Sequence, residues 1–395
     1  FFASVVAQLF FPPDMPEWLR QLQTFGIFAA GYLARPLGGI IMAHFGDRIG
    51  RKRMFMLSVL LMAVPTLLMG VLPTYATVGI LAPLLLLVLR ILQGAAVGGE
   101  VPGAWVFVAE HAPNGRSGFA IGVLTAGLTL GIVLGSAMSS FVNSFWQHDE
   151  VLAWAWRVPF LIGGAFGLLA VWLRRYLQET PVFEELRKRR ELVRGLPLKV
   201  VLQGHRMAVV RVMLITWTLT AGIVVVILMT PALVQSQYSI SAAEAANAST
   251  LATLALTLGC VIYGMAVDRF GTTRVLLVGS TGLALAAGGL YWTLQHAVGH
   301  FTLAFAISGL LVGVTRAIPS LMVNLFPAPI RFSGISFSYN VAYAICGGLT
   351  PLAVTLWLRA GEAYAPVYYV AAACLAGALA ILIARSAPSR ILATE

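Results

Sequence analysis

The sequence predicts an all-α integral membrane protein built from two related helix bundles. Hydrophobic residues make up 59% of its 395 residues, only 10% are charged, and the mean hydropathy is +0.87. No soluble core needs so much apolar material. Two similar charged turns, at Asp47 and Asp268, lie 221 positions apart (268 − 47), each between two long apolar runs. This repeat predicts two pseudo-symmetric bundles related by an axis along the membrane normal.

The apolar runs give the predicted spans in order, because a bilayer core of about 30 Å needs about 20 apolar residues. Eleven runs approach or exceed this length: 21–45, 54–74, 80–111, 117–145, 155–175, 207–232, 244–267, 275–295, 301–323, 332–358 and 365–384. The apolar segment 1–11 is too short to cross, and we interpret it as the outer half of a first helix that begins before Phe1. The prediction is twelve transmembrane helices, the first one truncated.

Three parts follow from this layout. An N-terminal six-helix bundle covers residues 1–175, a cytoplasmic linker covers 176–206, and a C-terminal six-helix bundle covers 207–395. The linker contains a short amphipathic helix, which we expect to rest at the lipid surface and join the bundles. A regulatory or partner-docking role is the alternative.

The basic residues orient the chain. In this layout most of the 26 Lys and Arg residues fall on one side of the membrane, and that side is the cytoplasm by the positive-inside rule. We expect a multi-pass monomer in the cell (inner) membrane with both termini in the cytoplasm. The net charge of +11 then reflects this bias and contact with anionic lipid, so we expect no nucleic-acid partner. No metal-ligand spacing is found in the sequence, and we predict no metal or cofactor.

The first charged turn, from Gly46 to Arg53, joins two spans. Asp47 is placed to cap the positive N-terminal end of another helix, while Arg48, Arg51 and Arg53 are placed to pair with acids or lipid headgroups. Such a contact would hold one side of the protein closed. The alternative is that these charges only end the helix and obey the positive-inside rule.

Charges inside the spans are the best indicators of function, because a charge in hydrocarbon is costly and usually faces a cavity or a partner. Arg35, Arg90 and Arg316 lie near mid-span, and Glu100 is the one clear acid at comparable depth, which predicts an electropositive cavity. Arg90, Gln93 and Glu100 share a helix face. Ten residues separate Arg90 from Glu100, a rise of about 15 Å, so we expect no direct pair.

These charges define the predicted site. We expect Arg90 and Arg316 to bind an anionic substrate, since a guanidinium offers paired donors to a carboxylate, and we expect Glu100 and Arg90 to take part in proton coupling. Pro319 follows Arg316 as a predicted bend. Asn340 and Tyr343, on one face of 332–358, and Gln93 are further candidates for the substrate. Structural contacts between helices are the alternative for each.

Several motifs together resemble the metabolite:proton symporter family of the major facilitator superfamily. They are Arg35-Pro36-Leu37-Gly38-Gly39, Gly46 to Arg53, Gln93-Gly94, Gly98-Gly99-Glu100, Ala109-Glu110, Trp154 to Phe160 and Glu179-Thr180-Pro181, with looser matches at Phe326 to Arg331 and Gly347 to Pro351. The resemblance implies twelve helices, a central cavity, and uptake of small organic acids or zwitterions with protons.

The resemblance also assigns gating partners. Asp47 would meet the start of the span at Phe332–Ser333, with Glu110 and Arg116 completing a charge cluster, and Arg35 would have a structural or gating role. By pseudo-symmetry, Asp268 would face the start of the span near Ser117.

Four positions depart from the family pattern. Ala43 replaces a Gly, Asn324 stands where an acid is common, and Thr272 and Thr273 replace basic residues. We call a contact that would hold one side of the protein closed a latch. The two threonines predict that the latch at Asp268 is weaker than the latch at Asp47. The family's aromatic-acidic signature in the first helix would precede Phe1.

The sequence therefore predicts a secondary carrier that moves a small organic anion and protons together by alternating access. Proton-coupled uptake of a betaine or proline is the runner-up, and a betaine site would use an aromatic box, for which Trp105, Trp217, Tyr263 and Tyr343 are the candidates. A polytopic membrane enzyme or receptor is the other class of protein considered. The spans carry no pair of a nucleophile and a general base that would support an enzyme.

Overall fold

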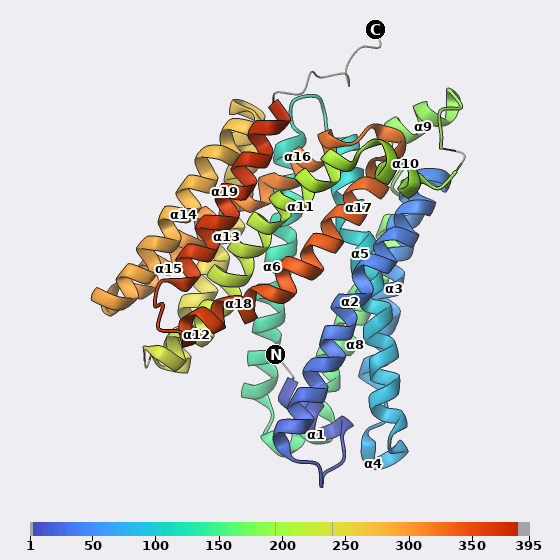
Figure 1. The fold of residues 1–395 in the computed structure, drawn as a ribbon. Coiled ribbons are helices and arrows are strands. Elements are labelled where there is room, and N and C mark those ends of the chain that lie inside the picture. The colour runs from blue at the N-terminus through green and yellow to red at the C-terminus, as the bar shows by residue number, and fades with distance from the viewer. Residues whose placement is uncertain (1–2, 194, 239, 386–395) are drawn as a thin grey trace. The chain divides into compact units, whose positions relative to one another are not determined.

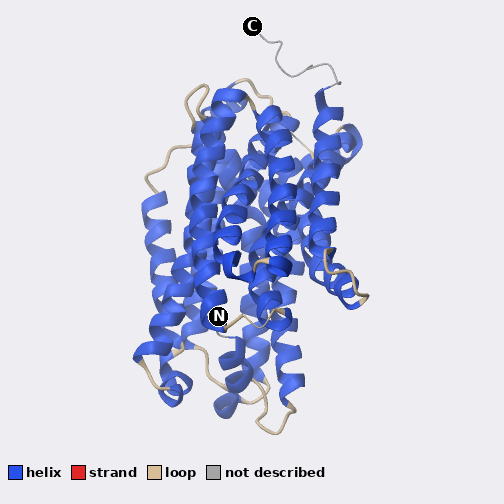
Figure 2. Ribbon diagram, turned by 90° about the vertical axis from the view of Figure 1, so that its left-hand side faces the viewer, coloured by secondary structure: helices blue, strands red, loops and turns tan. Residues whose placement is uncertain are grey.

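The fold comes from a computed structural model that describes residues 3–193, 195–238 and 240–385. Phe1 and Phe2 of the predicted partial first helix lie outside the described residues, as does the predicted cytoplasmic end, residues 386–395. The secondary structure of the described residues consists of helices alone (Figures 1 and 2). The predicted all-α class is confirmed.

Eleven helical spans in the described chain are long and apolar enough to cross a membrane. They are built by α2 (Glu17–Ile49); α3 (Arg51–Val71); α5 (Leu81–His111); α6 (Ser117–Phe145); η1 (Val151–Ala155) with α8 (Arg157–Arg174); α11 (Arg206–Ala221) with η2 (Gly222–Met229) and α12 (Thr230–Gln237); α13 (Ala242–Phe270); α14 (Thr272–His296); η3 (Val298–His300) with α15 (Phe301–Val312), η4 (Gly313–Ala317) and α16 (Ile318–Leu325); η5 (Ala328–Ile330) with α17 (Arg331–Ala342), η6 (Tyr343–Gly347) and α18 (Gly348–Arg359); and α19 (Ala365–Arg385). Each of the eleven predicted long runs overlaps one of these spans. Shorter helices are α1 (Ala3–Phe10), α4 (Tyr75–Val78), α7 (His148–Glu150), α9 (Pro181–Lys188) and α10 (Pro197–Gly204).

Packing groups the chain into two compact units. The first contains Phe1–Ala104 and Leu134–Arg194, and the second contains Trp105–Val133 and Gly195–Glu395. The boundaries between units therefore fall inside α5 and α6 as well as in the linker. The predicted bundles at 1–175 and 207–395 rest on the sequence repeat and stay a prediction.

In the first unit, α2 and α5 approach closely through glycines. A Cβ at Gly94 would overlap the carbonyl oxygen of Gly31, and a Cβ at Gly98 would overlap that of Arg35. Small residues permit such contact between helix backbones. As a consequence, the two helices present their polar faces side by side.

Each of the two charged turns contains a glycine with positive φ and extended ψ. Gly50 alone separates α2 from α3, with φ 136° and ψ 142°, and Gly271 alone separates α13 from α14, with φ 83° and ψ 144°. Residues with a side chain rarely adopt these angles. Gly50 and Gly271 are themselves 221 positions apart (271 − 50), so the repeat seen in the sequence recurs in the backbone.

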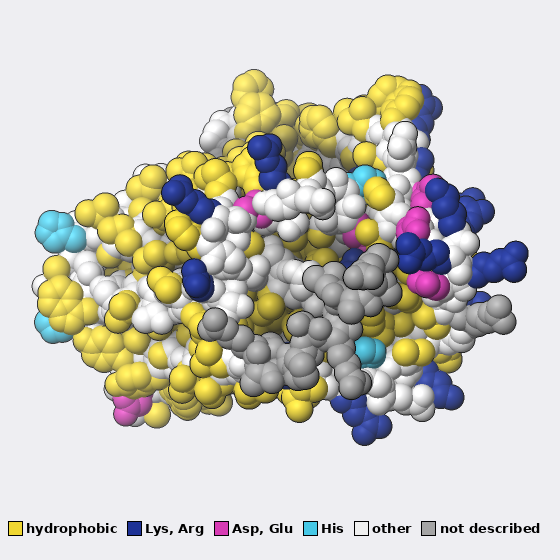
Figure 3. All heavy atoms as spheres, turned by 90° about the horizontal axis from the view of Figure 1, so that it is seen from above, with side chains coloured by type: hydrophobic (Ala, Val, Ile, Leu, Met, Phe, Trp, Pro, Cys, Tyr) yellow, Lys and Arg dark blue, Asp and Glu magenta, His cyan; other side chains and the backbone are white. Residues whose placement is uncertain are grey.

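Of two predictions about local structure, the amphipathic linker helix is confirmed, and the bend at Pro319 stays a prediction. The five residues of η4, which include Arg316, form a 3-10 turn directly before α16, where Pro319 lies at the first turn. The linker forms the amphipathic helix α9, which buries Phe183 and Leu186 and leaves its basic residues exposed. Figure 3 looks onto the end of the helices where α9 lies, and Lys and Arg side chains gather along that edge. The role of α9 at a lipid surface stays a prediction.

Candidate functional site

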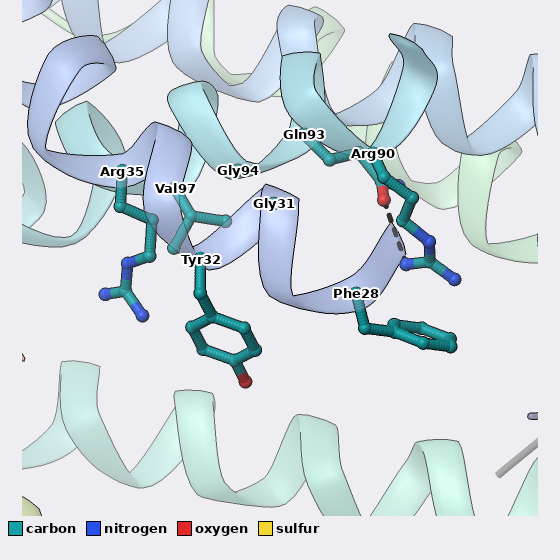
Figure 4. A pocket seen from close by; sticks show the side chains of 8 residues that line it. All are labelled: Phe28, Gly31, Tyr32, Arg35, Arg90, Gln93, Gly94 and Val97. Carbon is teal, nitrogen blue, oxygen red and sulfur yellow. Dashed lines mark hydrogen bonds between the residues drawn. The ribbon is translucent and has the colours of Figure 1, made fainter. Parts of the chain in front are cut away.

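A pocket of about 230 Å³ lies between α2 and α5 in the first unit. Each helix contributes four residues with the spacing i, i+3, i+4 and i+7, which is the spacing of one helix face. The lining residues are Phe28, Gly31, Tyr32, Arg35, Arg90, Gln93, Gly94 and Val97. Figure 4 shows the side chains of Phe28, Tyr32, Arg35 and Arg90 pointing to the same side. Arg90 and Phe28 also border a second, largely apolar pocket of about 610 Å³.

Arg90 is held by neutral groups. Its Nη1 donates to Oε1 of Gln93 at 3.1 Å (Figure 4), and its guanidinium lies 4.4 Å from the centre of the Phe28 ring. Gln93 in turn donates from Nε2 to Oγ1 of Thr66 at 2.6 Å. These contacts orient the guanidinium, but within the described residues no carboxylate pairs with Arg90.

Arg35 is the second cation of the pocket. It is buried, and its guanidinium carbon lies 5.9 Å from the centre of the Tyr32 ring. The lining thus contains two guanidiniums, one amide, one phenol and no acid. The predicted electropositive character is present in this pocket, while the substrate and gating roles of Arg35, Arg90 and Gln93 stay predictions.

Glu100 does not line this pocket. It has no nearby cation on its own helix, as expected, but its Oε1 accepts a hydrogen bond from Nη2 of Arg174 on α8 at 3.3 Å. The Arg174 guanidinium also lies 3.7 Å from the centre of the Phe55 ring. The second oxygen of Glu100, Oε2, is buried with no hydrogen-bond partner in the described residues. Sequence reasoning missed this partner, because Arg174 lies on another helix, 74 residues later in the chain.

The first charged turn is compact. Asp47 is buried, and its Oδ1 lies 3.8 Å from Nη2 of Arg51 one helical turn later. Arg48 contacts the ring nitrogen Nε2 of His44 at 3.2 Å, and Arg53 is exposed. The proposed partner of Asp47 at Phe332–Ser333 belongs to the other unit, and the gating role stays a prediction.

Glu179 holds the start of α3, a role that sequence reasoning missed. Its Oε1 accepts from the backbone N–H groups of Arg51 at 3.1 Å and Lys52 at 3.0 Å, and also from that of Thr180. The first N–H groups of a helix have no partner within the helix, and a carboxylate there is favoured by the helix dipole. The Glu179-Thr180-Pro181 motif was a signal for this contact, although its partner lies about 128 residues away.

Asp268 makes the corresponding contact in the second unit. Its two oxygens accept from the backbone N–H groups of Gly118 and Phe119, each at 2.7 Å. These are the second and third residues of α6. The predicted position of Asp268, facing the start of this helix near Ser117, is confirmed, and its role as a weaker latch stays a prediction.

Glu110 forms an ion pair with Arg331. Nη1 of Arg331, the first residue of α17, donates to Oε1 of Glu110 at 2.7 Å, and the Glu110 side chain is 2% exposed. Arg116, the other predicted member of this charge cluster, is exposed in the loop before α6. Arg331, the last residue of the Phe326 to Arg331 motif, is therefore a partner of Glu110 that the sequence did not predict.

Arg316 lies in the η4 turn of the second unit and is half-buried. Its Nε is buried without a hydrogen-bond partner in the described residues. Asn340 is buried and donates from Nδ2 to the carbonyl oxygen of Ser336 at 2.8 Å. Tyr343 begins η6 and its ring centre lies 5.5 Å from that of Tyr339. Substrate contacts of Arg316, Asn340 and Tyr343 stay predictions.

Three of the four aromatic residues considered for a betaine site have other neighbours described here, and a shared aromatic box stays a prediction. The Trp105 ring packs edge-on against Tyr339 at 4.8 Å, and Trp217 packs against Tyr369 at 5.9 Å. Tyr263 lines a separate groove, described below. No group of three or more metal-ligating side chains is found in the described residues.

Comparisons with known proteins agree with this fold. The Major Facilitator Superfamily profile matches residues 1–230. The chain is 32% identical over 390 residues to a putative proline/betaine transporter of Staphylococcus aureus strain COL, covering 94% of this chain and 80% of that protein. It is 30% identical over 386 residues to a citrate-proton symporter of Klebsiella pneumoniae, covering 96% and 86%.

A solved structure has the same fold. A proton:xylose symporter superposes with a TM-score of 0.79 at 18% identity, covering 97% of this chain and 90% of that one. The resemblance found in the sequence motifs is confirmed by the family profile and the relatives. The chain, with its eleven apolar helices and its transporter relatives, belongs to the Major Facilitator Superfamily.

Proposed function

We propose that this chain is a secondary active transporter that imports a small organic anion together with protons by alternating access. It would lie in the inner membrane with both termini in the cytoplasm, as the distribution of its basic residues predicts. The substrate class rests on one observation: the guanidinium of Arg90 lies inside a span, and its contacts are the amide of Gln93 and the ring of Phe28.

The charge balance of the pocket supports an anion. An unneutralised guanidinium in hydrocarbon is costly, and such residues usually face a ligand pathway or a partner. A carboxylate entering beside Arg90 would neutralise a charge that no acid in the described residues balances, and Gln93 already holds Arg90 in place. The name of the Klebsiella relative, a citrate-proton symporter, is consistent with this substrate class.

A betaine or proline is the second candidate. The Staphylococcus relative is named a putative proline/betaine transporter, and the pocket contains the aromatic rings of Phe28 and Tyr32. However, these rings lie near the guanidiniums of Arg90 and Arg35, so a quaternary ammonium would meet two like charges there. The geometry therefore favours the anion.

Proton coupling is proposed for Glu100. Its Oε1 is paired with Arg174, while Oε2 is buried without a partner in the described residues, which leaves an acceptor for a proton inside the span. If Glu100→Gln still concentrates substrate against its gradient with a proton gradient alone, Glu100 is not needed for coupling and is a structural contact.

Uptake into proteoliposomes tests the function. The panel contains mono-, di- and tricarboxylates, proline and glycine betaine, each with and without an inward proton gradient. We expect carboxylate uptake that depends on the gradient, and an Arg90→Ala loss of affinity of roughly tenfold to a hundredfold, since hydrogen bonds to charged groups contribute about 1.5–3 kcal/mol. Arg359→Ala, at an exposed arginine ending α18, is the control. Uptake of betaine with no carboxylate transport would remove the anion proposal.

A further inference from the structure

The second unit carries an apolar groove that the transport proposal does not use. It has a volume of about 470 Å³ and lies between α13 and α14, with one residue from α15. Tyr263, Ala266 and Phe270 line it from α13, and Arg274, Val278 and Gly282 line it from α14. Val278 is 75% exposed and Phe270 is 55% exposed, so the groove opens to the outside of the helices.

The groove is nearly as long as one leaflet is deep. Its charged end lies at the turn between two membrane spans, 243–270 and 272–296, which is where a span leaves the hydrocarbon. From Arg274 to Gly282 the helix rises about 12 Å, and half of the hydrocarbon core is about 15 Å. The lining thus follows the path of a lipid acyl chain from the interface inward.

The hollow is built by glycines in α14. A Cβ at Gly279 would overlap the side chain of Val314, so this position must stay small for the helices to pack. At Gly282 the nearest atom to an added Cβ, Cδ2 of Leu311, is 3.7 Å away. A larger side chain at Gly282 would therefore fill the groove without a backbone clash.

The mouth of the groove is positively charged. Arg274 and Arg269 are both exposed at the turn. The acid of this turn, Asp268, directs both oxygens to the amides of Gly118 and Phe119, so it is engaged elsewhere. A phosphate at the interface would find guanidinium donors there, which bind phosphate well.

We propose that this groove is a binding site for an anionic phospholipid, with one acyl chain along α13 and α14 and the headgroup phosphate at Arg274. The charge of Arg274 selects an anionic lipid, and the hollow at Gly282 receives its chain. The site is separate from Arg90 and its pocket, so its test does not depend on transport.

Native mass spectrometry of the purified full chain tests this site. The protein is titrated with phosphatidylglycerol and phosphatidylcholine that have identical acyl chains, and the affinity of the first bound lipid is measured. We expect phosphatidylglycerol to bind more tightly, and Arg274→Ala to weaken it about fivefold, as one basic residue near a membrane surface implies. Gly282→Leu should weaken both lipids, because it fills the groove.

Two matched variants are the controls. Arg359→Ala removes another exposed arginine at the end of a span, and Gly289→Leu enlarges an exposed glycine of α14 that has no described neighbour within 4 Å. Both should bind phosphatidylglycerol like the parent. Equal affinity for the two lipids, or no effect of Arg274→Ala, would show ordinary contact with bulk lipid and overturn the proposal. A dimer that Gly282→Leu separates, with lipid binding unchanged, would instead assign the groove to a second copy.

Discussion

Arg90 and Arg174 are two guanidiniums within spans of the first unit, and they are stabilised differently. Arg174 has a carboxylate, Glu100, at 3.3 Å and the Phe55 ring. Arg90 has the Gln93 amide and the Phe28 ring. Because Glu100 neutralises Arg174, the burial of this guanidinium is explained by the ion pair and by packing against Phe55. The charge of Arg90 is balanced by no acid in the described residues, which is why the proposed anion is assigned to it.

The Glu100–Arg174 pair gives a prediction at the residue scale. Arg174→Ala leaves a half-buried carboxylate unpaired, and we expect it to lower the free energy of unfolding by about 2 kcal/mol, less than the roughly 3–5 kcal/mol of a fully buried pair. Adding Glu100→Gln removes that unpaired charge and should restore part of the loss. Titration with a denaturing detergent measures both effects.

The exposed pair Glu185–Arg189, at 2.6 Å, is the control for this cycle. Exposed pairs contribute little, so Arg189→Ala should change stability by less than about 1 kcal/mol. A double variant no more stable than Arg174→Ala would show that packing of Arg174, and not its charge, holds the site.

At the scale of elements, the spans were predictable and their caps were not. A span is a local property, since length and apolar composition decide it, and the runs from 21–45 to 365–384 all became helical spans. The cap of α3 depends on Glu179, which lies on another segment more than 120 residues later. The position of Asp268 was predictable only because the repeat and the family resemblance supplied a partner.

The Glu179 cap gives a prediction for α3. Glu179→Ala leaves the amides of Arg51 and Lys52 without their acceptor, and we expect their hydrogen exchange to become at least tenfold faster, since a hydrogen bond to a charged group contributes about 1.5–3 kcal/mol. Exchange is measured by mass spectrometry on peptides that cover the start of α3. Glu184→Ala, at an exposed acid in the first turn of α9, is the control. Unchanged exchange at α3 would show that water replaces the carboxylate without loss.

At the scale of the whole molecule, the repeat is visible in both sequence and backbone. Gly50 and Gly271 adopt similar unusual angles at equivalent positions, and the spacing of Asp47 and Asp268 predicted this equivalence. The compact units were not predictable, because they cut through α5 and α6 and depend on packing between distant segments. The pocket residues Phe28 and Tyr32 were also missed, since an aromatic residue in an apolar run carries no separate signal.

The two turns give a prediction about gating. We expect Asp47→Asn to lower transport while surface level and folding stay close to the parent, because a charge that caps a helix end would bias one access state. Asp268→Asn should have a smaller effect, since Thr272 and Thr273 replace the basic residues of the first turn. Uptake rates at matched surface level decide between these outcomes. Equal loss in both variants would mean that the two turns contribute equally.

The remaining prediction concerns Arg316, whose half-buried guanidinium has no ion-pair partner in the described residues. If it contacts the anionic substrate, Arg316→Ala should weaken carboxylate binding to the purified protein by roughly tenfold to a hundredfold. Arg316→Lys should be nearly as harmful, because an ammonium cannot offer the paired donors of a guanidinium. Unchanged carboxylate affinity in Arg316→Ala would remove Arg316 from the substrate contacts.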